Sequence, residues 1–341
     1  MSHSAIVSFG RYLPVFRITT ATIAEHWGQD GRGIAASIGV EEKTVPAPDE
    51  DTFTMAFEAS KQAIAMAGIA SSEVSAVFVG SESHPYAVKP TSAMLATALE
   101  LHPFSFAADL EFACKAGTAA MQIVDAFVRS GQIHYGLAIG SDTAQAKPGD
   151  ALEYTASAGA AALLLGSERS ASAIARIEET LSFTTDTPDF WRPSGEKFPH
   201  HAGRFTGEPG YFHHVREAIR GIVEVAKLDL REIDHVILHM PNAKFPQAIA
   251  KEFGITKEQL RHGLIVPRIG NTYSACSPLG LTFVLEEAKK DETILLVSYG
   301  SGSGADAFFM TMLRDGVRLP PDEREEQHVD YSQYIEHSRT H

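Results

Sequence analysis

The chain has 341 residues, 44% of them hydrophobic and 21% charged, which is typical of a globular protein that buries a sizeable core in one large domain or two fused halves. Its net charge of −14, without a basic run or a basic-aromatic cluster, argues against nucleic acid as a partner. Two cysteines without a CxxC pair, no apolar run of membrane-spanning length and no signal-peptide pattern lead us to expect a cytoplasmic protein that binds no membrane.

The first half of the chain is predicted to alternate strands and helices. Apolar runs predict strands at 5–12, 74–80, 104–109, 135–141 and 158–165. Helical spacing, N-terminal caps and glycine stops predict helices at 20–27, 52–67, 91–101 and 119–128. The strand at 104–109 is expected to be buried, and the polar, glycine-rich segment 28–33 is expected to be a loop.

The second half follows the same pattern. Strands are predicted at 170–180, 235–239, 293–299 and 305–313, and helices at 211–227, 246–253, 257–262 and 279–290. Loops are predicted at 183–210 and 270–278, with a tight turn at 300–304, and the first loop is long enough to indicate a functional segment. The pattern suggests two similar α/β halves, 1–168 and 169–318, that meet at one site, followed by a peripheral polar tail at 319–341.

Cys114 is predicted to lie where a strand ends and a helix begins. The N-terminus of a helix carries free N–H groups and a partial positive charge, which favour a thiolate and stabilise a developing oxyanion. Cys114 is therefore a candidate nucleophile. The alternative is a small, buried, apolar cysteine with a packing role.

Other polar residues fall at similar corners of the predicted fold. Glu82 and His239 follow buried strands, Asn271 follows a glycine, and the turn at 300–304 is rich in glycine and serine. Singly, these residues have ordinary explanations as a solvated loop carboxylate, a hydrogen-bonded core histidine and a turn residue. Together they supply a nucleophile, a base whose pKa a dry pocket would raise, an amide donor and backbone N–H groups for an oxyanion.

These segments carry a resemblance to a known family. Residues 112–117 (F-A-C-K-A-G), 270–274 (G-N-T-Y-S) and 300–304 (G-S-G-S-G) resemble the thiolase superfamily. Residues 80–90 (G-S-E-S-H-P-Y-A-V-K-P), 203–209 (G-R-F-T-G-E-P) and 239–242 (H-M-P-N) resemble the archaeal type of hydroxymethylglutaryl-CoA synthase. The resemblance runs from the first strand to about Leu313. It implies a thiolase-like, five-layered α-β-α-β-α fold of two similar halves, normally dimeric.

The resemblance also implies a reaction, the condensation of acetyl-CoA with acetoacetyl-CoA and water to 3-hydroxy-3-methylglutaryl-CoA and CoA in the mevalonate route. In it, Cys114 carries the acetyl group as a thioester, and Glu82 removes a proton from the acetyl methyl group and later helps water release the product. His239 orients acetoacetyl-CoA and protonates the attacked carbonyl oxygen. Substrate contacts are implied for Asp30, Gly31, Thr155, Arg204, Thr206, Lys244, Asn271 and Ser301. No metal or cofactor is implied, since the CoA thioesters are substrates.

Departures from the related families narrow this interpretation. Type III ketoacyl synthases lack a general-base Glu at the position of Glu82, and biosynthetic thiolases need a second cysteine in a loop that contains none here. Cys276 lies elsewhere and is expected to be a packing residue. Gln247 and Ala248 stand where a basic residue is expected, which weakens one expected contact with a CoA phosphate.

Three alternatives remain at this stage: a type III ketoacyl-synthase-like enzyme with another acceptor, a non-catalytic scaffold subunit of the same fold, and metal binding. The metal alternative rests on His200, His201, His213 and His214, which lack clear ligand spacing. The archaeal-type resemblance further implies a complex with an acetoacetyl-CoA thiolase, bridged by a small zinc-ribbon/OB-fold protein.

Overall fold

The computed structural model describes residues 3–143 and 146–338. Within these residues, nine strands form one hydrogen-bonded sheet in the order β11-β12-β13-β8-β1-β7-β6-β4-β5, and two smaller sheets, β10-β9 and β14-β2-β3, lie apart from it. Five strands come from the first half of the chain: β1 (Ser4–Tyr12), β4 (Val74–Gly80), β5 (Phe106–Leu110), β6 (Tyr135–Thr143) and β7 (Ala158–Ser167). Four come from the second half: β8 (Ala175–Thr184), β11 (His235–Leu238), β12 (Thr293–Val297) and β13 (Gly304–Met312). Among the described residues, the two sets of strands join where Ala5 and Ile6 pair with β8.

The two halves share one topology. In the first half, β7 pairs antiparallel with β1 and β6, and β6 runs parallel to β4. In the second half, β13 pairs antiparallel with β8 and β12, and β12 runs parallel to β11. The order β1-β7-β6-β4 is therefore repeated as β8-β13-β12-β11. This repetition confirms the prediction of two similar halves.

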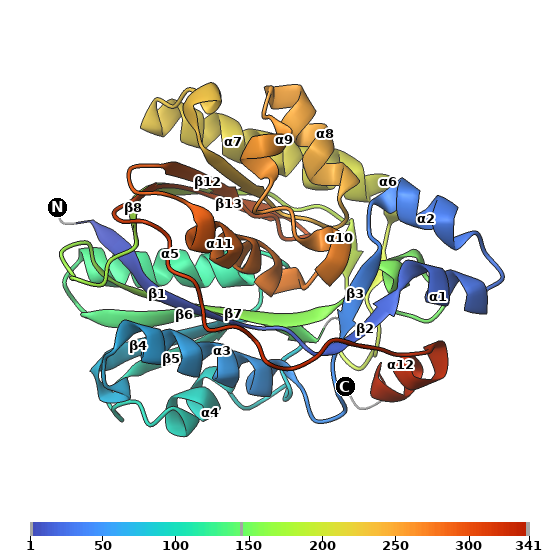
Figure 1. The fold of residues 1–341 in the computed structure, drawn as a ribbon, viewed down its shortest axis with the longest axis horizontal. Coiled ribbons are helices and arrows are strands. Elements are labelled where there is room, and N and C mark those ends of the chain that lie inside the picture. Colours follow the sequence, from blue (N-terminus) through green and yellow to red (C-terminus); the bar gives the residue numbers. More distant parts are fainter. Residues whose placement is uncertain (1–2, 144–145, 339–341) are drawn as a thin grey trace.

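Helices cover both faces of each set of strands (Figure 1). One outer layer consists of α3 (Thr52–Ala67) and α4 (Thr91–Ala98), and the other of α7 (Phe212–Ala226) and α8 (Lys244–Phe253). Between the two sets of strands lie α5 (Ala116–Arg129) and α11 (Cys276–Glu287). Because side chains alternate along a strand, Val77 of β4 packs toward α3, whereas Phe78 packs toward α5. The layers follow the expected α-β-α-β-α order.

The remaining α-helices and strands lie beside these layers. They are α1 (Thr20–His26), α2 (Gly31–Ile38), α6 (Gly203–Phe205), α9 (Lys257–Leu260), α10 (Val266–Ile269) and α12 (Tyr331–Ser338), together with β2 (Phe16–Thr19), β3 (Glu42–Val45), β9 (Phe190–Trp191), β10 (His200–His201) and β14 (Gln327–His328). Within residues 3–143 and 146–338, no helix combines the length and apolar character needed to cross a bilayer.

Three predicted segments are wrong in part. The loop expected at 28–33 gives way to α2 from Gly31, because Ile34 and Ile38 supply an apolar face that packs on the cluster around Ile18. The loop expected at 270–278 ends early because α11 begins at Cys276, and a proline in the first turn of a helix loses no hydrogen bond. The strand predicted at 170–180 is displaced to β8.

The strand predicted at 104–109 is β5, which is the edge strand of the sheet and not a buried strand. The side chains of Phe104 and Phe106 are 93% and 52% exposed. Hydrophobic character alone does not distinguish a strand buried in the core from one whose apolar residues face outward.

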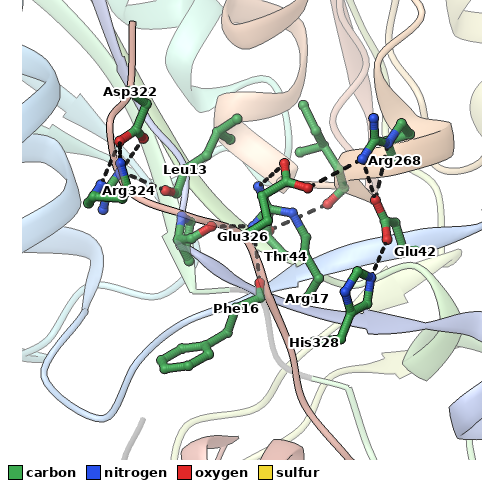
Figure 2. A network of polar contacts seen from close by, with 12 residues as sticks. Leu13, Phe16, Arg17, Glu42, Thr44, Arg268, Asp322, Arg324, Glu326 and His328 are labelled. Atoms are coloured by element: carbon green, nitrogen blue, oxygen red, sulfur yellow. Dashed lines mark hydrogen bonds and ion pairs between the residues drawn. The ribbon is translucent and has the colours of Figure 1, made fainter.

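The C-terminal segment is not peripheral, contrary to the expectation for a polar tail. β14 adds to β2 as a parallel strand, and Figure 2 shows the polar contacts along the approach to it. Arg324 donates to the main-chain oxygen of Leu13 at 3.0 Å, and Glu326 accepts from Arg17 and Arg268, both at 3.3 Å. These ion pairs explain why so polar a sequence is held against the body of the protein.

Helix α12 then covers a buried amine. The Lys43 Nζ atom lies 3.2 Å from the Tyr334 hydroxyl and 4.6 Å from the centre of its ring. The same ammonium donates to the main-chain oxygens of Glu153 at 2.5 Å and Ala156 at 2.8 Å. Because these carbonyls flank Thr155, the C-terminal helix supports a segment that contains one of the predicted substrate contacts.

Candidate active site

Cys114 lies in the turn between β5 and α5, as predicted. Ala113 has a φ of +45°, and the N–H of Ala116 donates to the Ala113 carbonyl at 3.1 Å. A non-glycine residue with positive φ is uncommon and marks a strained turn. The turn leaves Cys114 only 5% exposed, two residues before the first residue of α5.

Cys114 and Glu82 are in direct contact. The thiol donates to Glu82 Oε1 with a sulfur–oxygen distance of 3.3 Å. Glu82 follows β4, which is the strand next to β5, so the carboxyl ends of two parallel strands bring the two side chains together. The sequence placed both residues at corners of the fold, and the structure brings those corners together.

Burial controls the protonation of this pair. Burial, reinforced by the charge of Asp142, raises the pKa of Glu82 to about 8, while Arg192 acts in the opposite direction. Burial and the neighbouring Glu82 raise the pKa of the Cys114 thiol well above its usual value. Burial therefore outweighs the helix terminus, and the expectation of a favoured thiolate is wrong. Cys114 is a thiol hydrogen-bonded to the Glu82 carboxyl group, whose ionised form can accept the thiol proton.

Asp142 holds the corner around Glu82. Its Oδ1 atom accepts from the Glu82 N–H at 2.8 Å and from the hydroxyls of Ser81 and Ser83 at 2.7 and 2.6 Å. Its Oδ2 atom accepts from the N–H of Ser274 at 2.9 Å. Asp142 therefore links the loop after β4 to the segment that follows Asn271.

His239 lies at the end of β11 and is 1% exposed. Its N–H donates to Val297 at 2.9 Å, and its carbonyl accepts from the Tyr211 hydroxyl at 2.7 Å. The ring lies 6.3 Å from that of Tyr299, centre to centre, and its Nδ1 has no partner among the described residues. Burial lowers the pKa of His239 to about 3, so the imidazole is neutral and able to donate one hydrogen bond.

Asn271 is fixed by its own backbone. Its N–H donates to the carbonyl of Thr155 at 2.7 Å, and its carbonyl accepts from Ser157 at 3.0 Å. Its side-chain Oδ1 accepts from the N–H of Tyr273 at 3.0 Å. The side-chain NH₂ takes part in none of these bonds. Tyr273 packs against Cys114, so the Asn271 segment also forms one wall beside the thiol.

The turn at 300–304 lies against the turn that carries Cys114. A Cβ atom on Gly300 would come within 2.6 Å of the Phe112 carbonyl, so only glycine permits this approach. Gly300 and Gly304 bond to each other's carbonyls, and the N–H of Gly302 donates to Asp189 at 2.8 Å. Within the described residues, these bonds leave the N–H groups of Ser301 and Ser303 as the oxyanion donors that the turn can offer.

A cavity of about 240 Å³ opens beside Glu82 and the turn that carries Cys114. Ser301 lines it together with Ser81, Glu82, Ser83, Glu111, Ala113, Asp142, Phe190, Trp191, Arg192, Pro199 and Tyr273. The segment around β9 contributes Phe190, Trp191 and Arg192, so the long irregular stretch expected to be functional forms part of the cavity wall.

The remaining predicted contacts are not among the residues that line this cavity. Asp30 precedes α2 without a side-chain capping bond, Gly31 begins α2, Arg204 lies in α6, Thr206 follows α6, and Lys244 begins α8. α2 and α8 meet where the N–H of Ala243 donates to the carbonyl of Ile38 at 2.9 Å. The side chains of Asp30, Arg204 and Lys244 are exposed, as are those of Gln247 and Ala248.

Three of the four histidines considered for metal binding have separate polar partners, and the ring of His213 packs against those of Phe183 and His214. His200 contacts Glu196, His201 contacts Asp150 at 2.9 Å, and His214 contacts Thr185 at 2.8 Å. Across residues 3–143 and 146–338, no group of three or more His, Cys, Asp or Glu side chains is arranged to hold a metal ion.

Sequence reasoning missed Asp142, Tyr273 and Arg192. Asp142 could have been found, because it follows the strand predicted at 135–141, whose carboxyl end lies beside that of the strand before Glu82. Tyr273 lies inside a motif already noted. Arg192 gives no local signal, since only the folding of the long loop brings it to Glu82.

Comparisons with known proteins agree on the family. Residues 223–312 match the family described as 3-oxoacyl-(acyl-carrier-protein) synthase III C terminal. A hydroxymethylglutaryl-CoA synthase from Archaeoglobus fulgidus is 51% identical, with 98% of each chain covered. Another from Methanothermobacter thermautotrophicus is 50% identical, with 97% of each chain covered.

Solved structures show the same fold. A hydroxymethylglutaryl-CoA synthase crystallised with CoA aligns with a TM-score of 0.89 at 21% identity, covering 98% of this chain and 90% of that one. A 3-oxoacyl-(acyl carrier protein) synthase III from Pseudomonas aeruginosa aligns with a TM-score of 0.82 at 19% identity, covering 93% of this chain and 100% of that one. At these identities the structural likeness establishes the fold alone.

Proposed function

We propose that this chain, which belongs to the archaeal-type hydroxymethylglutaryl-CoA synthase family, condenses acetyl-CoA with acetoacetyl-CoA and water to give 3-hydroxy-3-methylglutaryl-CoA and CoA. This is an acyltransferase reaction of the mevalonate pathway. The hydrogen bond between the Cys114 thiol and the Glu82 carboxylate carries the proposal, because the reaction needs a thiol nucleophile and a base at one point.

In the first step, Cys114 takes the acetyl group. The sulfur attacks the carbonyl carbon of acetyl-CoA while the thiol proton passes to Glu82, 3.3 Å away. The bond from the carbonyl carbon to the CoA sulfur then breaks, and the CoA sulfur leaves with that proton. A carboxylate with a pKa of about 8 is suited to both transfers, since it accepts and returns a proton near neutral pH.

In the second step, Glu82 removes a proton from the methyl group of the acetyl thioester. The negative charge develops on the thioester oxygen, and backbone N–H groups of Cys114 and of the turn at 300–304 are the proposed donors to it. The resulting carbanion attacks the ketone carbon of acetoacetyl-CoA. His239, neutral and buried, donates its ring proton to the ketone oxygen and so completes the 3-hydroxyl group. The proton that Glu82 took from the methyl group then passes to the imidazole, which restores neutral His239 and returns Glu82 to the carboxylate needed in the last step.

In the last step, water attacks the thioester on Cys114. Glu82 takes one proton from the water, the carbon–sulfur bond breaks, and the free thiol is restored as the product acquires its carboxylate. Asn271, Ser301 and Thr155 are proposed to contact the acyl groups. Two observations support these contacts: backbone hydrogen bonds hold Asn271 to Thr155 and Ser157, and Ser301 lies in the cavity wall.

The CoA moiety is proposed to bind at the ends of the helices beside the site. Arg204 and Lys244 supply positive charge for its phosphates, with Thr206 beside Arg204. Asp30 and Gly31 supply contacts at the start of α2. The contact between α2 and α8 supports this arrangement, because it joins two of the three elements that carry these residues.

The test is the intact mass of the protein after acetyl-CoA alone and then after acetoacetyl-CoA, with Cys114→Ser and Glu82→Ala run in parallel. We expect an acetyl adduct on wild type that acetoacetyl-CoA discharges, and no adduct on Cys114→Ser. An adduct on wild type that acetoacetyl-CoA fails to discharge would indicate another acceptor, as in a ketoacyl synthase. Absence of any adduct would indicate a ligand-binding or scaffold protein.

The proposal extends to the assembly. The exposed Phe106 on the edge strand β5 and the exposed Phe104 just before it support a homodimer, since a free apolar edge is otherwise an aggregation hazard. Family membership supports a complex with an acetoacetyl-CoA thiolase and a small zinc-ribbon/OB-fold bridging protein, and a pull-down that returned the synthase alone would count against it. A free nucleophilic thiol is suited to a reducing compartment, which supports a cytoplasmic location.

A further inference from the structure

The cavity beside Cys114 has an unbalanced charge. Three carboxyl groups line it, those of Glu82, Glu111 and Asp142. Because burial raises the pKa of Glu82 to about 8, Glu111 and Asp142 supply the negative charge near neutral pH. Among the described residues of its wall, Arg192 is the one with a permanent positive charge. The positive charge of Arg192 therefore shares a cavity wall with negatively charged side chains, at the place where the proposed chemistry occurs.

Arg192 is hydrogen-bonded to Glu82, the proposed general base. It follows β9 in the long loop, and its Nη2 atom donates to the main-chain oxygen of Glu82 at 2.9 Å. Its charge opposes the effects of burial and Asp142 on the Glu82 carboxyl. The guanidinium therefore contacts Glu82, and the Glu82 side chain in turn contacts the Cys114 sulfur that carries the thioester.

The proposed reaction changes the charge of what the cavity holds. The acetyl and hydroxymethylglutaryl thioesters on Cys114 are neutral at the end attached to sulfur. Hydrolysis forms a carbon–oxygen bond and breaks the carbon–sulfur bond, leaving a carboxylate on the product, a proton on the thiol and a proton on Glu82. A new anion thus appears beside Asp142 and Glu111, where it needs a cation or must leave.

We propose that Arg192 is the residue that receives the carboxylate freed from Cys114, so that it recognises the charged end of the product. This inference rests on the proposed function. A guanidinium pairs with a carboxylate through two parallel N–H groups, a geometry that a neutral acyl group does not offer. Arg192 therefore distinguishes the product from neutral thioesters of the same shape.

The test compares two ligands that differ by one group. Dissociation constants are measured for 3-hydroxy-3-methylglutaryl-CoA and for 3-hydroxy-3-methylbutyryl-CoA, which lacks the carboxylate, on wild type, Arg192→Gln and Arg192→Lys. Lys197→Gln is the matched control, because Lys197 shares a neighbouring depression with Arg192 but does not line the cavity. We expect Arg192→Gln to weaken binding of the charged ligand by about tenfold or more. Its affinity for the neutral ligand should stay within about twofold, and Arg192→Lys should recover part of the loss.

Two results would overturn the inference. Equal losses for both ligands would mean that Arg192 only holds the backbone of Glu82, and unchanged affinity for the charged ligand would mean that it does not bind the carboxylate. Both are distinct from failure of the proposed function, which shows as a missing or undischarged acetyl adduct on wild type. If wild type forms and discharges that adduct while Arg192→Gln binds both ligands normally, only the role of Arg192 fails.

Discussion

Replacement of Glu82 by glutamine should stabilise the protein, by an amount that depends on pH. In the folded state, burial and Asp142 raise the pKa of this carboxyl from 4.5 to about 8. The unfolded chain therefore ionises Glu82 at a lower pH than the folded protein does, and keeping the carboxyl protonated costs free energy of folding between these two values. The cost is absent below pH 4.5, rises with pH, and levels off above pH 8. Glutamine has no such cost and still offers an oxygen to the Cys114 thiol.

The magnitude follows from the shift. Each pH unit above 4.5 adds about 1.4 kcal/mol, so the cost at pH 7 reaches roughly 3 kcal/mol. Because Glu82 is partly exposed at the cavity, water screens its charge and roughly 1–3 kcal/mol is the expected range.

The assay is the melting temperature of wild type and Glu82→Gln from pH 5 to pH 8, with Glu111→Gln as control because Glu111 is an exposed carboxyl at the same cavity. The gain for Glu82→Gln should grow with pH, together with a loss of turnover. An equal gain at pH 5 and pH 8, or no gain at any pH, would refute the reasoning.

Three further predictions follow from single contacts. Asp142→Asn should destabilise the fold by about 2–4 kcal/mol in chemical denaturation, because an amide cannot accept from all four donors that now bind the carboxylate; a loss below 1 kcal/mol would contradict this. His239→Ala should still form the acetyl adduct but discharge it about 10²–10⁴-fold more slowly in rapid-mix mass spectrometry, whereas failure to acetylate would place His239 in the first step. Tyr334→Leu should lower the free energy of unfolding by about 1–3 kcal/mol and raise the KM for acetoacetyl-CoA, because it uncovers Lys43 beneath α12. Tyr334→Phe keeps the ring over Lys43, so its KM should stay close to that of wild type. An unchanged KM in Tyr334→Leu would separate the C-terminal helix from the site.

The sequence predicts those helices and strands whose ends are set by interactions between residues close together in the chain. Helix α3 begins after Asp51, whose side chain accepts from Thr54 in a capping box, and it ends at Gly68 in the left-handed conformation. Both features are visible in the sequence because they involve residues three apart or a glycine at a stop. The corners that carry Cys114 and Glu82 were found for the same reason, since strand ends and helix starts are local.

What the sequence did not reveal depends on contacts between distant segments. The C-terminal tail was expected to be peripheral because its charges are suited to solvent, yet Glu326 pairs with Arg17 and Arg268, residues separated from each other by most of the chain. Likewise, nothing near Arg192 in the sequence indicates that it bonds to the backbone of Glu82, 110 residues away. Charge alone does not predict exposure when the partner is unknown.

The residue after the nucleophile shows why both halves are needed. Lys115 is buried and pairs with Asp306 of β13 at 2.9 Å, and Asp306 also accepts from Thr118 and Ser182 at 2.8 and 2.7 Å. A buried ion pair adds little net stability, because desolvation offsets the attraction, but removing one partner leaves an uncompensated charge. The pair therefore penalises any displacement of α5 relative to β13. We infer that it fixes the position of Cys114 relative to the turn at 300–304 of the second half, so that the oxyanion donors and the nucleophile are held by contacts that neither half makes alone.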